Sequence, residues 1–269
     1  MRLDRQPQGK GSYVYGNLVR THGGGCQNQG FRLNNRFLKS KDLGILLDKT
    51  FYSESSLVLH FYTLERGFQS YIFKGGLKKR KALNQLGLYE LSYFKRPESD
   101  LGIINQLDFA WTPLALFEHP QKVMLVFFMT DILQQTLRYQ GPDPQLFYFV
   151  RDQLLRLETN EQLRDFPGTF LAQYLMVLGY TPLIDGDGYS VFDMNTGRFS
   201  HALGDNSNCV QDRTMLDYLA AQFWPEGTVQ FSGVVHKEGL RVLIQYATIH
   251  LANFNIDKTL EILHDTLYD

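Results

Sequence analysis

The spacing of apolar residues changes once along this chain, near residue 113. From residue 42 to residue 113 apolar side chains recur at every second position, as in Leu57, Leu59 and Phe61, which is the period of a half-buried β-strand. From residue 114 onward they recur at three- and four-residue spacings, which is the period of an amphipathic helix. The sequence therefore predicts an α+β chain in which an all-β part precedes a helical part.

Five short strands are expected in the all-β part, over residues 43–47, 55–64, 68–73, 88–94 and 101–107. A short helix is expected at Ala82–Leu86, between the third and fourth strands. So many short strands in about 70 residues indicate a small closed barrel. The oligonucleotide-binding (OB) fold is the commonest such architecture, and an SH3-like barrel is the main structural alternative.

The remainder of the chain predicts an all-helical domain with a small hairpin insertion. Helices are expected over 118–140, 144–158 and 168–179, with stop signals at Gly141-Pro142 and Gly179. The hairpin is expected over Tyr189–Phe199, with its turn at Asn195-Thr196-Gly197. Two apolar stripes predict further helices, the first made of Met215, Leu216, Leu219, Ala220 and Phe223, and the second of Leu240, Leu243, Ile244, Ala247, Leu251 and Phe254.

The charged residues divide the chain into the same parts. Residues 1–41 hold eight basic residues and one acidic residue, residues 42–113 hold nine and eight, and residues 114–269 hold ten and nineteen. We therefore expect a disordered basic extension at 1–37, a barrel domain at 38–113 and a helical domain at 114–269. The extension is interpreted either as an arm that touches nucleic acid or as an upstream segment without function.

The sharpest local feature is a basic run at residues 74–81, which leaves the third expected strand in a glycine-containing loop. Its five cations are Lys74, Lys78, Lys79, Arg80 and Lys81. Clustered cations suit a phosphate backbone, because each neutralised phosphate releases condensed counterions. Tyr71 and Phe73 share a face of the preceding strand, so they are candidates for stacking on unpaired bases or, alternatively, for core packing. The alternative for the basic run is a loop that only confers solubility.

Signatures of enzymes, metal sites and membrane spans are missing from the sequence. It contains no phosphate-binding loop, nucleophile elbow, dinucleotide fingerprint or His-Glu-x-x-His motif, so no enzymatic activity or small-molecule substrate is expected. Cys26 and Cys209 are too few for a disulfide framework or a four-cysteine zinc site. Asp185-Gly186-Asp187-Gly188 is interpreted as a tight turn. No apolar run reaches 18 residues, and we expect a cytoplasmic protein without a membrane partner.

Several segments, in order, resemble the bacterial recombination mediator RecO, in the form found in the Bacteroidetes. They are Lys39–Leu47, Tyr52–Val58, Phe61–Thr63 with Gly67, and Lys74-Gly75 near the start, and Tyr246–Phe254 and Lys258–His264 near the end. The resemblance covers about residues 38–269. It implies an OB-fold domain followed by a helical domain, and a cytoplasmic, nucleoid-associated role in DNA repair and recombination.

The resemblance also implies partners and contact residues. RecO proteins bind single- and double-stranded DNA, anneal complementary strands and, with RecR, help load RecA onto DNA coated by single-stranded DNA-binding protein (SSB). The five cations at 74–81 would then be DNA contacts, and Arg138 or Arg151 would meet a carboxylate of the SSB C-terminal tail.

The sequence departs from the RecO pattern at one place, and one alternative function stands beside the resemblance. Many RecO proteins carry a four-cysteine zinc module after a Leu-Gly-Tyr-like segment, whereas Gly179–Cys209 here retains only Cys209. We therefore predict neither a metal nor another cofactor. The alternative function is a protein-binding adaptor, whose OB or SH3-like barrel makes no direct contact with DNA.

Overall fold

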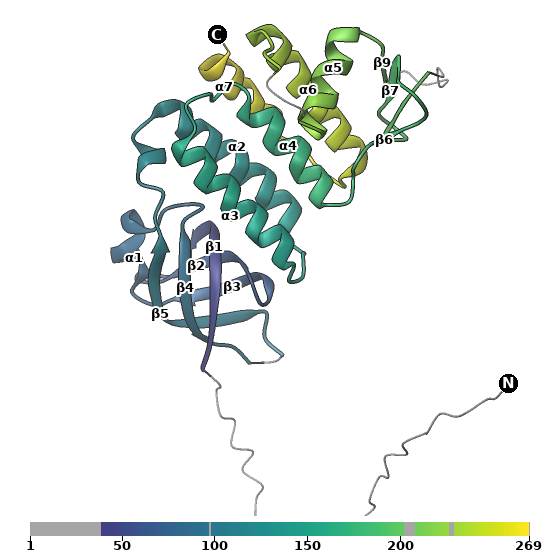
Figure 1. Cartoon of the computed structure of the whole chain (residues 1–269). Coiled ribbons are helices and arrows are strands. Elements are labelled where there is room, and N and C mark those ends of the chain that lie inside the picture. Colours follow the sequence, from purple (N-terminus) through teal and green to yellow (C-terminus); the bar gives the residue numbers. More distant parts are fainter. Residues whose placement is uncertain (1–38, 97, 202–207, 226–228, 269) are drawn as a thin grey trace, which may run out of the picture. The chain divides into compact units, whose positions relative to one another are not determined.

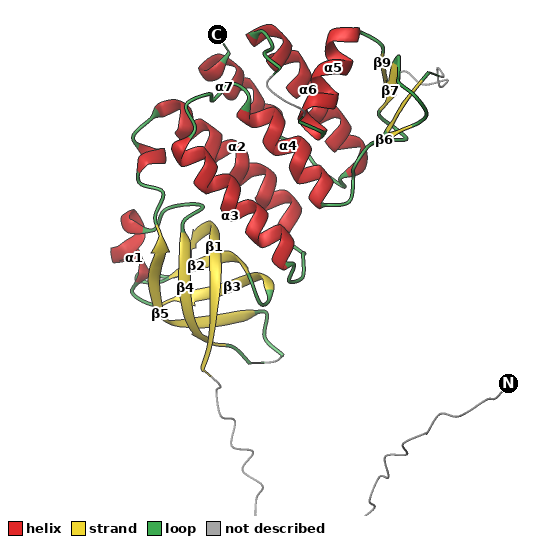
Figure 2. Cartoon of the chain, viewed as in Figure 1, coloured by secondary structure: helices red, strands yellow, loops and turns green. Residues whose placement is uncertain are grey.

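The computed structural model describes residues 39–96, 98–201, 208–225 and 229–268 (Figure 1). The expected extension at 1–37 lies outside the described residues. Strands come first and helices follow, as Figure 2 shows. This order confirms the α+β class and the change of period near residue 113.

The first part of the structure is a closed five-stranded barrel. Its strands are β1 (Lys39–Phe51), β2 (Leu57–Thr63), β3 (Gly67–Phe73), β4 (Leu88–Phe94) and β5 (Leu101–Trp111). They follow one another around the barrel in the order β1-β2-β3-β5-β4, and β4 pairs with β1 to close it. Only the β3–β5 pair is parallel among these five strands. The predicted OB-fold barrel is thereby confirmed.

Strand β1 is longer than the predicted segment 43–47 and is buried on both faces where it is most apolar. Leu46 faces the barrel interior, whereas Ile45 and Leu47 belong to a second apolar cluster that contains the helices. The pairing with β2 shifts register between Leu46 and Asp48, which marks a β-bulge. Burial on both faces explains why this stretch is continuously apolar instead of alternating.

The second part of the structure is helical and carries one small sheet. Its long helices are α2 (Pro120–Leu137), α3 (Pro144–Thr159), α4 (Phe166–Val177), α5 (Arg213–Phe223), α6 (Gly233–His250) and α7 (Asp257–Leu267), with a short 3₁₀ turn, η2 (Ala115–Phe117), before α2. Between α4 and α5 lie β6 (Leu183–Ile184), β7 (Val191–Asp193), β8 (Arg198–Ser200) and β9 (Cys209–Val210). The predicted hairpin supplies β7 and β8, which form a four-stranded sheet with β6 and β9.

Two local predictions differ from the structure. The short helix expected at Ala82–Leu86 is wrong: the helical residues are α1 (Gly76–Lys79) and η1 (Arg80–Ala82). Residues beyond Ala82 turn instead, because Leu86 adopts a left-handed backbone (φ +57°) and the Tyr89 hydroxyl is bound by Asn84. Helix α6 ends at His250 although its apolar stripe continues to Phe254, which packs in the core from a turn.

Barrel and helices are joined through the β2–β3 hairpin. The Phe68 N–H donates to the Gln140 carbonyl at 3.0 Å, and the Tyr62 hydroxyl donates to the Gly141 carbonyl at 3.3 Å. Gly67 has φ +67°, and a Cβ placed there would lie 2.3 Å from the Gly141 carbonyl carbon. The described residues, from Lys39 onward, pack as one compact unit. Separate barrel and helical domains divided at residue 113 stay a prediction.

Candidate nucleic-acid interface

The predicted basic loop is a short helical platform on the barrel. Lys74 lies in the turn after β3, Lys78 and Lys79 lie in α1, and Arg80 and Lys81 lie in η1. All five residues are exposed, and none of them is paired with a carboxylate among the residues that the structure describes. We call these five residues the basic cluster. Exposed, unneutralised cations at this density are the electrostatic requirement for gripping a phosphate backbone.

The basic cluster is held in place by hydrogen bonds to strand β1 and to the β1–β2 connection. The Lys49 ammonium donates to the carbonyls of Arg80 at 3.1 Å and Leu83 at 2.5 Å, and the Leu77 N–H donates to the Ser55 carbonyl at 3.3 Å. Burial, reinforced by the nearby Arg80 charge, lowers the pKa of Lys49. The chain enters α1 through Gly75, whose φ of +69° is a left-handed backbone that glycine adopts without strain.

Tyr71 and Phe73 lie inside the barrel, where the packing alternative expected them. Tyr71 is fully buried and its ring centroid lies 4.7 Å from that of Tyr93, while Phe73 is 8% exposed. Burial also raises the pKa of Tyr71 well above its usual value. Both rings therefore pack in the interior of the barrel, in the wall that carries the basic cluster.

One exposed aromatic ring lies beside the basic cluster and a second follows it in the chain, both at positions that the sequence did not indicate. Phe51 ends β1 and is 62% exposed, and Tyr52 follows it and is 57% exposed. The Arg80 guanidinium lies 4.3 Å from the centroid of the Phe51 ring. The signal in the sequence is faint: Lys49 and Phe51 are two residues apart, so they share the face of β1 that looks toward η1.

Comparison with known proteins finds a family match for the barrel and relatives along most of the chain. Residues 38–111, which span the barrel, match the family described as "Recombination protein O N terminal". The DNA repair protein RecO of Christiangramia forsetii is 22% identical over 82% of this chain and 96% of its own length. Those of Flavobacterium psychrophilum and Bacteroides fragilis are 23% and 25% identical, each over 85% of this chain and 99% of its own. The resemblance to RecO is confirmed.

The two arginines that the RecO resemblance suggested for a partner lie on different helices. Arg138 follows the last residue of α2, is exposed, and lines a groove with Asp48, His60 and Gln134. Arg151 lies in α3, pairs with Asp152 at 2.7 Å and covers the Tyr148 ring at 4.6 Å from its centroid. Of the two, Arg138 is therefore the one without a carboxylate partner along the described chain, and a partner contact for either stays a prediction.

The expectation that the protein holds no metal or other cofactor stays a prediction. Cys209 is the one cysteine of the described part, and no three His, Cys, Asp or Glu residues gather there as a metal site would require. Asp185 is instead held by Arg198, whose Nη1 lies 2.7 and 3.0 Å from its two carboxylate oxygens. Gly186 and Gly188 both have positive φ, as the predicted tight turn requires. Within the described stretches, no helix is long and apolar enough to cross a membrane.

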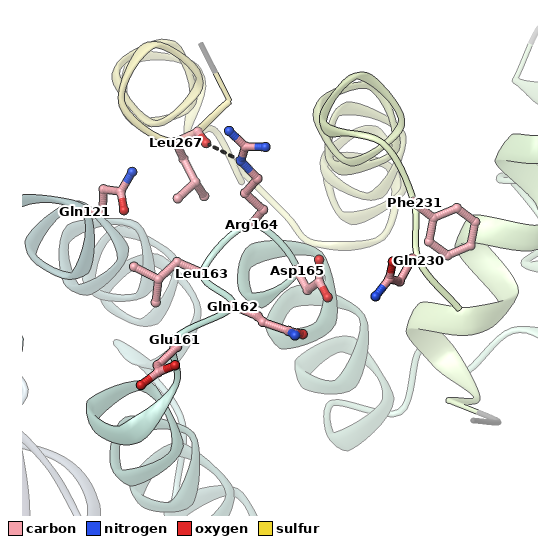
Figure 3. Close-up of a pocket in the computed structure, with 9 residues that line it drawn as sticks. All are labelled: Gln121, Glu161, Gln162, Leu163, Arg164, Asp165, Gln230, Phe231 and Leu267. Atoms are coloured by element: carbon pink, nitrogen blue, oxygen red, sulfur yellow. Dashed lines mark hydrogen bonds between the residues drawn. The ribbon is translucent and has the colours of Figure 1, made fainter. Parts of the chain in front are cut away.

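A polar hollow lies at the start of α4, between the α3–α4 connection and the end of α7. Figure 3 shows Arg164 and Asp165 in it, on the connection between α3 and α4. The Arg164 Nε donates to the Leu267 carbonyl at 3.3 Å, which ties this connection to the end of α7. Asp165 accepts from Nε2 of the buried His236 at 2.9 Å, which ties it to α6. Arg164 and Asp165 therefore act as bridges between helices.

Proposed function

We propose that this protein is a non-enzymatic recombination mediator that binds DNA through its OB-fold barrel. In this proposal it binds single- and double-stranded DNA, anneals complementary strands and, with RecR, helps load RecA onto SSB-coated DNA. The observation that carries the proposal is the basic cluster, because five exposed cations without carboxylate partners stand on a braced platform of the barrel. The relatives' name, DNA repair protein RecO, supports the same role.

Annealing follows from the same electrostatics. Two complementary strands repel each other through their phosphates, and a protein that neutralises phosphates on both lowers that repulsion. The helical part carries an excess of acidic residues, so we assign it to protein partners and not to phosphate. Arg138 or Arg151 would there meet a carboxylate of the SSB tail.

The test is the variant Lys78→Ala, Lys79→Ala, Arg80→Ala and Lys81→Ala, measured by fluorescence anisotropy with labelled oligonucleotides over a range of salt concentrations. If the four side chains contact four phosphates, the slope of log affinity against log salt should fall by about 2.8 on single strands. Affinity should fall on every sequence, and annealing of complementary oligonucleotides should slow in parallel.

The control variant removes exposed cations from the helices, Arg156→Ala in α3 and Lys258→Ala in α7. Its salt slope should match that of the unchanged protein. An unaltered slope in the basic-cluster variant would favour the alternative, an adaptor whose barrel binds only proteins.

A further inference from the structure

Two large aromatic side chains of the barrel are exposed where the hydrophobic effect would favour burial. Phe51, the last residue of β1, is 62% exposed and Tyr52, which follows it, is 57% exposed, whereas Tyr71 and Phe73 on β3 are buried. We call Phe51 and Tyr52 the aromatic pair. Adjacent exposed rings beside a charged cluster indicate a contact surface for a ligand that has both aromatic and charged parts.

The aromatic pair is fixed relative to the basic cluster. Phe51 is still paired with Leu57 in the β1–β2 ladder, and the Tyr52 N–H donates to the Ser56 carbonyl at 3.1 Å. The same turn supplies the Ser55 carbonyl that accepts from the N–H of Leu77 in α1. The backbone that carries the aromatic pair and the backbone of α1 are therefore joined, and little backbone entropy is lost when a ligand binds both.

The Phe51 ring is held by a cation and still has a free face. The Arg80 guanidinium lies 4.3 Å from its centroid, within the range of a cation–π contact. Such a contact covers one face of the ring, and the 62% exposure shows that most of the side chain remains open. A flat aromatic ligand can stack on the remaining face.

The charges around the β1–β2 turn determine where the phosphate backbone and the bases of a bound polynucleotide lie. Glu54 is exposed in the same turn and repels phosphate, whereas Lys78, Lys79 and Lys81 attract it. A polynucleotide therefore places its backbone along α1 and η1 and its bases over the aromatic pair. Only unpaired bases can do this, because the faces of bases in a duplex are already stacked on their neighbours.

We propose that Phe51 and Tyr52 stack on unpaired bases and make the barrel prefer single-stranded over double-stranded DNA. This inference rests on the proposed function, since it assumes that the basic cluster holds the phosphates. The cations supply affinity for either form of DNA, and the aromatic pair supplies the difference between them.

The test uses a double variant that carries both Phe51→Ala and Tyr52→Ala. Its DNA affinity is measured by fluorescence anisotropy at fixed salt and is compared with that of the unchanged protein. Three probes of equal length are used: a single strand, the same strand with abasic sites, and the duplex. The variant should lose at least about fivefold in affinity for the intact single strand, the loss that about 1 kcal/mol of stacking gives. Affinity for the duplex and the abasic strand should change less than twofold.

Two further variants separate stacking from other effects. Phe51→Trp with Tyr52→Phe should retain single-strand affinity, whereas Phe51→Leu with Tyr52→Leu should lose it, since leucine is apolar but has no ring. The matched control is Tyr148→Ala on α3, which removes an exposed ring covered by Arg151 at 4.6 Å, away from the basic cluster. It should leave all three affinities unchanged.

The outcomes distinguish this inference from the function on which it rests. Equal losses on single strand, abasic strand and duplex would overturn the stacking role, and so would no loss on the single strand while the basic-cluster variant binds weakly. If the aromatic pair served a protein partner instead, the variant should lose affinity for none of the three probes. If the basic-cluster variant itself binds DNA normally, the proposed function fails first.

Discussion

The close approach of the barrel to residues 140 and 141 can be tested by alanine substitutions at three glycines. Together they separate the energy cost of a left-handed backbone from the cost of a steric clash. At Gly67 an added Cβ would meet both a positive φ of +67° and the backbone of residues 140 and 141, at 2.3 to 2.4 Å. At Gly75 the φ is +69° but nothing lies within 4 Å of that position. At Gly141 there is neither a positive φ nor a neighbouring atom within 4 Å. Substitution by alanine should therefore cost strain and clash, strain alone, and nothing, respectively.

The expected magnitudes follow from these contacts. A left-handed backbone costs an alanine about 1–2 kcal/mol. Forcing backbone apart costs about 1–3 kcal/mol, and the bond from the Phe68 N–H to the Gln140 carbonyl is worth about 0.5–1.5 kcal/mol. Gly67→Ala should thus lower the free energy of unfolding by about 3–6 kcal/mol and Gly75→Ala by about 1–2 kcal/mol. Gly141→Ala should change it by less than about 0.5 kcal/mol.

Differential scanning fluorimetry and urea unfolding would measure the three variants side by side. For a chain of this size, 1 kcal/mol shifts Tm by about 2–4 °C, so Gly67→Ala should melt at least about 6 °C below the unchanged protein. If Gly67→Ala cost no more than Gly75→Ala, the close approach of the hairpin to residues 140 and 141 would be refuted.

Three further predictions concern single side chains. Burial lowers the pKa of His60 below its usual 6.5, against the opposing charge of Asp48 and with a smaller contribution from Arg138, so the unfolded chain takes up a proton first and stability is lost as pH falls below about 6.5; His60→Gln should make that loss shallower in urea titrations at pH 7.5 and 5.5. Tyr89→Phe removes the hydroxyl that joins both backbone groups of Asn84, at 2.8 and 3.2 Å, and should cost about 1–3 kcal/mol in urea unfolding; no change would remove this turn from the reasons why η1 ends where it does. Asp185→Ala breaks an exposed pair with Arg198 and should lower Tm by no more than about 4 °C, with or without calcium; a calcium-dependent Tm in the unchanged protein would contradict the tight-turn interpretation.

Strand and helix periods were readable from the sequence where one face is buried. Strand β4 has the predicted bounds, Leu88–Phe94, and α3 begins at the predicted Pro144, where Asp143 accepts from the Leu146 N–H at 3.1 Å. Capping residues and apolar alternation involve residues that are close in the sequence, so they can be recognised without the three-dimensional structure.

The details of the basic run depended on contacts that the sequence does not display. Its helical turn begins at Gly75 and is fastened to Ser55 and Lys49, which are distant in the chain. The period-two spacing of Tyr71 and Phe73 indicates that they share a face. It does not say that this face points into a closed barrel. The aromatic pair was missed for the same reason, since the exposure of Phe51 depends on where the helix after β3 comes to rest.

Strand β1 has a consequence for any attempt to divide this protein. Three apolar side chains do not pack inside the barrel but face outward, in the cluster that contains the helices: Ile45, Leu47 and Leu88. In a fragment that ends at residue 113, these side chains would form an apolar strip on the outside of the barrel that is exposed to water. We expect such a fragment to self-associate in gel filtration unless this strip is replaced by polar residues. The barrel and the helices would therefore have to be expressed and studied together.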